Sequence, residues 1–93
     1  MPAINFEKRT YNIEPSFKII CEIEDELGAV PQLADKFLRD KWAITELVTL
    51  IHIILNAMGK NVDYIELGNK ILNDGLDAYL KFATQFLHAT IYK

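Results

Sequence analysis

The chain has 93 residues, 51% of them apolar and 25% charged, which suits one domain built around a single core. Thirteen acidic and ten basic side chains give a net charge of −3, which argues against nucleic acid as the partner. A single cysteine excludes an intramolecular disulfide, and no apolar run reaches the roughly 18 residues that a membrane-spanning helix needs. The first ten residues are polar and charged, without a signal-peptide pattern, so we expect a cytoplasmic protein.

Residues 3–14 alternate apolar and polar side chains on either side of a charged centre. This alternation predicts a β-hairpin that turns near residues 7–9, although no Asn-Gly or Asp-Gly pair marks the turn. Because an isolated hairpin is barely stable, it must pack on the rest of the domain. The apolar side chains expected on its two strand faces are Ile4, Phe6, Tyr11 and Ile13.

From Ser16 onward the apolar spacing becomes helical, and we expect five helices to fill residues 16–92. Ser16 caps the first helix, and Gly28 ends it. The others are expected from Pro31 to about Arg39, from a Thr45 cap to Met58, from an Asp63–Glu66 capping box to Gly75, and from Leu76 almost to the C-terminus. The second helix should turn Leu33, Phe37 and Leu38 inward. The fold class is therefore mainly α, a compact bundle of about five short helices with an N-terminal β-hairpin.

Two of these helices have unusually wide apolar faces. The third carries only one narrow polar stripe, made of Thr45, Thr49, His52 and Asn56. A helix of this kind must be surrounded by others, so we expect it at the centre of the bundle. On the fifth helix, the middle of the apolar face is expected to be Leu76, Leu80, Ala83, Leu87 and Ile91. The other edge of that face is aromatic and consists of Tyr79, Phe82 and Phe86.

No catalytic motif, metal-ligand spacing or phosphate-binding loop is present, so we expect no enzyme, no metal and no cofactor. His52 and His88 lie on polar helix stripes and are interpreted as solvated surface residues. Cys21, on the expected inner face of the first helix, is interpreted as a buried, unreactive thiol. Gly68 lies inside a helix, where glycine costs about 1 kcal/mol relative to alanine, so we expect close helix packing there.

Acidic residues concentrate near the first helix. Residues 14–26 hold five acids and one lysine, a local charge of −4, so the rest of the chain sums to +1. Four of these acids crowd the C-terminal end of the helix: Glu22, Glu24, Asp25 and Glu26. The helix macrodipole favours cations at that end, so a compensating charge is expected. It could come from Lys36, Arg39 or Lys41 of the second helix, or from a basic segment of a partner protein.

Glu24 differs from its acidic neighbours, because a helical wheel places it on the face expected to be buried. A buried carboxylate must be paired or hydrogen-bonded. The free N–H groups at the start of the helix that opens at Pro31 could donate to it. We therefore predict structural roles for Glu24, which would fasten the turn at residues 28–32, and for Gly28, which ends the helix.

Four stretches of the sequence carry a family resemblance. They are residues 11–17 (Tyr-Asn-Ile-Glu-Pro-Ser-Phe), 23–28 (Ile-Glu-Asp-Glu-Leu-Gly), 42–48 (Trp-Ala-Ile-Thr-Glu-Leu-Val) and 66–76 (Glu-Leu-Gly-Asn-Lys-Ile-Leu-Asn-Asp-Gly-Leu). Their order resembles the small tail protein of gene transfer agents and tailed phages, described as a tail assembly chaperone and sometimes labelled a tail tube component. The resemblance covers nearly the whole chain, but the loop at residues 58–62 lacks the glycine-rich stretch that some members carry.

The resemblance implies a non-enzymatic role in building a phage-like tail. Such chaperones are thought to hold the tape-measure protein, a long helical chain, while tube subunits assemble around it. The implied partner is a tape-measure-like or tail tube protein on an assembling tail particle, and a homo-oligomer stays open. Two sets of residues could bind that partner: the aromatic edge Tyr79, Phe82 and Phe86, and the acids Glu22, Asp25 and Glu26. For the aromatic set, we favour plain core packing over partner binding.

Two other classes of protein stay open. One is a small cytoplasmic helical adaptor or regulatory module unrelated to phage tails. The other is a small enzyme whose site is assembled from scattered residues, which would require a polar pocket with a strongly perturbed titratable group. We rank the tail chaperone first, the adaptor second and the enzyme third.

Overall fold

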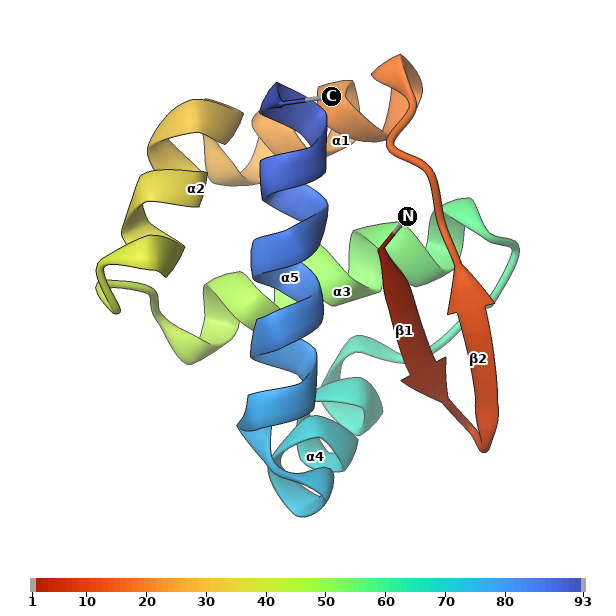
Figure 1. Ribbon diagram of the computed structural model, residues 1–93. Helices are drawn as coiled ribbons and strands as arrows, with labels where there is room; N and C mark the ends of the chain where they lie inside the picture. Colours follow the sequence, from red (N-terminus) through yellow and green to blue (C-terminus); the bar gives the residue numbers. More distant parts are fainter. Residues whose placement is uncertain (1, 93) are drawn as a thin grey trace.

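A computed structural model describes residues 2–92, and that part of the chain forms a two-stranded hairpin followed by five helices (Figure 1). The elements are β1 (Ala3–Phe6), β2 (Arg9–Asn12), α1 (Phe17–Leu27), α2 (Val30–Leu38), α3 (Ile44–Ala57), α4 (Tyr64–Asp74) and α5 (Leu76–Ile91). In Figure 1, α5 crosses in front of α3, with α1 and α2 above and to the left, α4 below and the hairpin to the right. The predicted mainly α class with an N-terminal hairpin is confirmed.

The hairpin has the predicted antiparallel pairing. Ile4 lies opposite Tyr11, so the two side chains share one face, and β1 packs that face on α5. Ile4 and Phe6 are each 2% exposed, so their side chains anchor the hairpin to the helices. This packing stabilises a two-stranded sheet whose own hydrogen bonds would not suffice. The turn consists of Glu7 and Lys8, both at positive φ (51° and 64°).

Local capping chemistry sets most helix ends. The Ser16 hydroxyl accepts from the Ile19 N–H at 3.3 Å, and the Asp63 carboxylate accepts from the Glu66 N–H at 3.1 Å. The predicted Thr45 cap is wrong, because α3 begins at Ile44 with Ala43 as its N-cap. There the Ala43 N–H donates to Glu46 Oε1 at 2.8 Å, so a carboxylate in the first turn takes the place of a capping hydroxyl.

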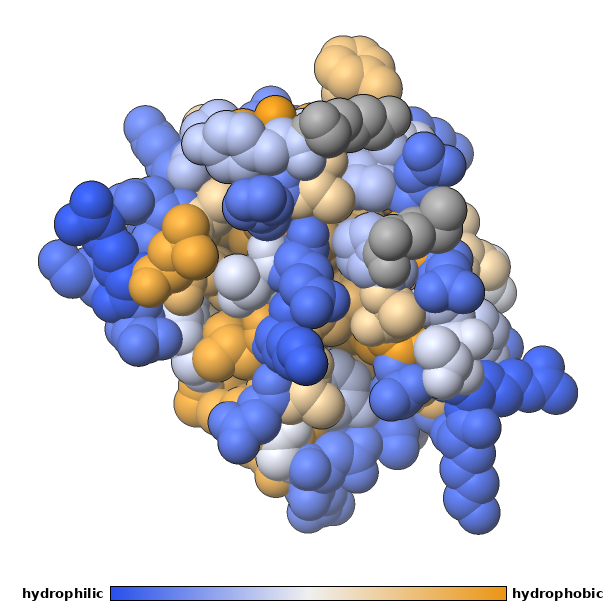
Figure 2. All heavy atoms as spheres, in the orientation of Figure 1, coloured by the Kyte–Doolittle hydropathy of each residue, from blue (hydrophilic) through white to orange (hydrophobic). Residues whose placement is uncertain are grey.

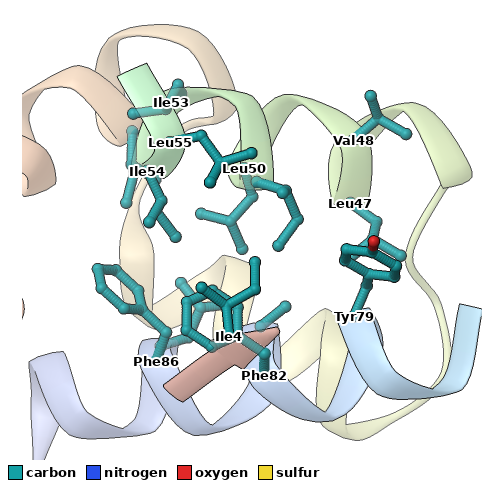
Figure 3. Close-up of a cluster of buried hydrophobic side chains, with 14 of the residues drawn as sticks. Ile4, Leu47, Val48, Leu50, Ile53, Ile54, Leu55, Tyr79, Phe82 and Phe86 are labelled. Carbon is teal, nitrogen blue, oxygen red and sulfur yellow. The ribbon is translucent and has the colours of Figure 1, made fainter. Parts of the chain in front are cut away.

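The core is centred on α3, as predicted. This helix packs against α1, α4 and α5, which cover its apolar circumference. Seven of its side chains are buried: Leu47, Val48, Leu50, Ile51, Ile53, Ile54 and Leu55. Figure 3 shows several of them facing side chains of α5 and Ile4 of β1. The hairpin therefore closes the core on a side that no helix covers.

The aromatic edge of α5 belongs to this core, in agreement with the favoured interpretation of core packing, and does not form an exposed partner surface. Tyr79, Phe82 and Phe86 are 4%, 2% and 0% exposed, and Figure 3 shows them directed toward α3. By contrast, Ile91, expected in the middle of the buried face, is 37% exposed. The buried face of α5 is therefore shifted from the predicted middle toward its aromatic edge, because α3 and β1 pack against that edge.

Three further burial predictions are wrong. Cys21 and Glu24 are exposed, because α1 lies at the margin of the bundle and buries only Ile19 and Ile23 fully. Leu38, at the end of α2, is 65% exposed. Each of these side chains lies on the outer edge of a helix that is covered on one side only.

Gly68 is not required by close packing inside the fold, contrary to expectation. A Cβ atom added there would lie 3.8 Å from Val48 Cγ1, an ordinary van der Waals distance. An alanine would therefore fit between α3 and α4 without displacing either helix.

Candidate functional site

The described residues, 2–92, contain no group of three or more His, Cys, Asp or Glu side chains arranged to hold a metal ion. Over the same range, no helix combines the length and the apolar character needed to cross a membrane. Two surfaces of this part of the chain could receive a protein partner, one acidic and one apolar.

The acidic surface consists of Glu22, Asp25 and Glu26, three carboxylates on the last turns of α1. They border a shallow depression between α1 and α3, whose other side is formed by His52, Ile53 and Asn56. Asp25 and Glu26 are exposed and Glu22 is half-buried. All three predicted acids therefore share one solvent-accessible surface.

None of these three acids forms an ion pair within the described residues. Lys36 instead pairs with Glu46 of α3 at 2.8 Å, which lowers the pKa of that carboxyl, and Arg39 pairs with Asp35 of its own helix at 2.9 Å. The expected compensation by α2 is therefore wrong. A two-residue link joins the end of α1 to the start of α2, so the acids lie beside the N-terminal end of α2, away from its basic residues. The basic end of this nine-residue helix is about 12 Å further along.

Glu24 makes the contact predicted for it, although it is exposed. Its Oε2 accepts from the Val30 N–H at 2.8 Å, in the first turn of α2. The Gly28 N–H donates to the Glu24 carbonyl oxygen at 3.2 Å, and Gly28 has a φ of +85°, which favours glycine. This carboxylate is thus directed into the α1–α2 turn rather than toward the acidic surface.

His52 is not a freely solvated histidine, whereas His88 is exposed as expected. His52 Nε2 lies 2.8 Å from the carbonyl oxygen of Val62, and Asn56 Nδ2 lies 3.4 Å from His52 Nδ1. A neutral ring protonated on Nε2 satisfies both contacts, since the carbonyl can only accept. His52 therefore fastens the loop before α4, while Thr45 and Asn56 of the same stripe are exposed.

The α3–α4 groove is the second surface, and sequence reasoning missed it. Ile44, Ile65 and Leu72 are 46%, 67% and 55% exposed, and they border a depression with Val48 and Gly68. Thr45, Tyr64 and Asn69 complete the lining, which contains no charged side chain. The available signal was the pair of large apolar residues seven positions apart around a glycine on α4.

A second apolar area lies between α2 and α5. Figure 2 shows hydrophobic side chains gathered to the left of α5 on an otherwise largely hydrophilic face. Leu38 and Leu80 line the depression there, together with the acidic side chains of Asp40 and Asp77. This area is therefore mixed in character, unlike the α3–α4 groove.

A comparison with protein families gives one match. A family model described as "Phage tail tube protein, GTA-gp10" matches residues 2–93. The match spans the hairpin and all five helices, so it concerns the whole fold rather than one motif. The same comparisons find no match among curated proteins or solved structures.

Proposed function

Since the chain belongs to the phage tail tube protein family of GTA-gp10, we propose that it assists tail assembly by binding the tape-measure protein through its acidic surface. The family makes the chain a component of a phage-like tail system. The tape-measure partner and the action as a chaperone are our proposal. The family match also favours a tail role over the tail-independent adaptor and over the enzyme.

The observation that carries the proposal is the unpaired acidic surface. Glu22, Asp25 and Glu26 lie at the end of a helix where the macrodipole is also negative, and among residues 2–92 no cation forms an ion pair with them. A basic segment of a partner would relieve this repulsion. Attraction between exposed charges of this kind speeds association and weakens as salt is added.

The test is co-expression with the tape-measure-like protein of the same genome, followed by affinity capture at low and high salt. The triple variant Glu22→Gln, Asp25→Asn, Glu26→Gln should lose capture at low salt, whereas the unchanged chain should lose it only as salt rises. A matched control neutralises three exposed acids elsewhere: Glu7→Gln, Asp40→Asn and Asp77→Asn. Because both variants change the net charge equally, only a local effect separates them.

Capture that survives in the acidic triple variant, or fails equally in the control, would exclude this surface as the binding site. The aromatic residues of α5 are unsuitable probes, because they lie in the core and their truncation would damage the fold.

A structural tube subunit is the second candidate function, favoured by the family's own description. Purified particles distinguish the two roles. Mass spectrometry that finds this chain in stoichiometric amounts in finished tails would favour the subunit, and its absence from them would favour the assembly role.

A further inference from the structure

We infer that the α3–α4 groove is the contact surface between two copies of this chain, related by a two-fold axis near Gly68. This inference is independent of the tape-measure proposal, because it concerns a different surface. The groove lies against the first turns of α3, at residues 44–48, whereas the acidic surface lies against residues 52–56 of the same helix. Both surfaces can therefore be occupied in one molecule.

The groove leaves three large apolar side chains partly in water. Three of its residues, Ile44, Ile65 and Leu72, are about half to two-thirds exposed. Its two walls are linked, since the Tyr64 hydroxyl lies 3.0 Å from Thr49 Oγ1 and thereby ties α4 to α3. An apolar groove between two linked helices is suited to receive another apolar surface.

Gly68 lies in the middle of this groove. A glycine inside a helix costs stability, and the space beside Val48 would accept an alanine methyl group. The fold itself therefore gives no reason for the glycine. Without a side chain at position 68, the backbone of α4 is open to close approach by another helix.

The arrangement of residues on α4 is self-complementary. Ile65 and Leu72 lie on the same side of the helix, seven residues and about 10 Å apart, with Gly68 between them. If a second α4 packs antiparallel across the groove, Ile65 faces Leu72 of the second copy, and Leu72 faces its Ile65. The two glycines then meet near the axis, as an interface formed by the same patch on both subunits requires.

The charges agree with this pairing. No charged side chain lines the groove, so two chains of net charge −3 can meet there without opposing like charges at the contact. Glu66 and Lys70, two residues before and after Gly68, lie on the opposite side of α4 from this contact, where Lys70 pairs with Asp74. The α2–α5 area, with Asp40, Asp77 and Lys81 in its lining, would instead bring charged side chains into the contact.

The size of the patch determines what kind of dimer to expect. Three partly exposed side chains supply a few hundred Å² of apolar surface, below the about 800 Å² per partner of a standard stable interface. The association should therefore be weak and concentration-dependent. It would be strongest where copies are crowded together.

Sedimentation of the purified chain from low micromolar to near-millimolar concentration tests the inference. The apparent mass should rise from that of one 10.7 kDa chain toward twice that value. Ile65→Glu places a charge in each half of the contact and should weaken association about tenfold or more. Leu38→Glu is the matched control, because Leu38 is exposed to the same degree but lies outside the groove.

The variant Gly68→Ala distinguishes an effect on the dimer from an effect on folding. It should raise the midpoint of urea denaturation, because the methyl group fits beside Val48, and yet weaken the dimer by holding the two helices apart. A chain that stays monomeric throughout would overturn the inference, as would a dimer lost in Leu38→Glu but kept in Ile65→Glu. A monomer whose capture by the tape-measure protein requires Ile65 would assign the groove to a partner helix instead.

Discussion

At Glu24, one carboxylate oxygen joins two helices. It accepts from the Val30 N–H, one of the amides at the start of α2 that lack a partner within that helix. The negative charge also suits this site, because the N-terminus of a helix carries a partial positive charge. The residue before α2 is Ala29, which has no capping side chain, so Glu24 supplies the cap from the preceding helix.

Glu24→Ala should therefore lower the free energy of unfolding by about 1 kcal/mol, the usual effect of losing a capping side chain. Urea denaturation measures this change. Glu26→Ala is the matched control on the same helix, since Glu26 is exposed and lies in the acidic surface. Equal losses in the two variants would contradict a structural role for Glu24.

Tyr79 and Asp74 form a side-chain hydrogen bond at the junction of α4 and α5. The Tyr79 hydroxyl donates to Asp74 Oδ2 at 2.9 Å, and Lys70 lies 3.3 Å from the same oxygen. The hydrogen bonds from Tyr79 and then from Lys70 hold the pKa of Asp74 below its usual value. Burial of the Tyr79 ring, and then the neighbouring carboxylate, raise the pKa of the phenol well above 10.0.

These shifts predict a pH dependence. Above pH 10 the unfolded chain loses the phenol proton while folded Tyr79 keeps it, so the free energy of unfolding should fall as pH rises. The slope should stay below the about 1.4 kcal/mol per pH unit of one full proton, because the hydroxyl reaches an exposed carboxylate. Tyr79→Phe should remove this alkaline loss. Denaturation at a series of pH values from 8 to 11 measures the free energy of unfolding of both proteins. An equal decrease with pH in the two proteins would contradict the role of Tyr79.

At the scale of the element, the hairpin turn is the most strained segment. Glu7 and Lys8 both have positive φ, which a type I′ turn requires but which side chains with a Cβ disfavour. Asn-Gly is the pair best suited to this geometry. The double variant Glu7→Asn, Lys8→Gly should therefore stabilise the chain by about 1 kcal/mol in thermal denaturation, as relief of two strained residues allows.

Thr10→Gly provides the contrast for that experiment. Thr10 lies in β2, opposite Asn5, where a glycine weakens a strand. It should destabilise the chain, whereas the turn variant should stabilise it. Destabilisation by both would indicate that the turn geometry differs from type I′.

At the scale of the whole molecule, stability depends on a core shared by α3, α5 and β1. Phe86 is fully buried in it. Phe86→Ala should cost about 3–5 kcal/mol, a large part of the about 5–15 kcal/mol that stabilises a typical domain. Circular dichroism should show a large drop in melting temperature. Leu38→Ala, at a position that is 65% exposed, should change it little. Similar losses in both variants would contradict the burial of the aromatic edge.

The helices and the hairpin were predictable because their signals are local. Ser16, Gly28 and Asp63 act on backbone groups within one helical turn, so their positions in the sequence suffice. The prediction of a Thr45 cap was wrong for an equally local reason. The carboxylate of Glu46 accepts from the Ala43 N–H, so the helix begins without a capping hydroxyl. The position of Glu24 beside α2 was also predictable, because only a short turn separates the two helices.

The candidate surfaces were only partly predictable. The acids of α1 were found by counting charges, but their lack of a cation depends on where α2 directs Lys36 and Arg39. The apolar face of α5 was recognised from its periodicity, but its orientation depends on which neighbours cover it. The α3–α4 groove requires Ile44 and Ile65, on two different helices, to lie side by side.

By itself, the sequence determined the elements, the apolar character of α3 and the concentration of acid at the end of α1, because these follow from side chains a few residues apart. Only the tertiary structure decided that Tyr79, Phe82 and Phe86 are core and that the acidic surface is unpaired. It also decided that Ile44, Ile65 and Leu72 share one groove. These outcomes depend on how each helix is rotated and crossed against its neighbours, and that arrangement is fixed by packing the whole core at once.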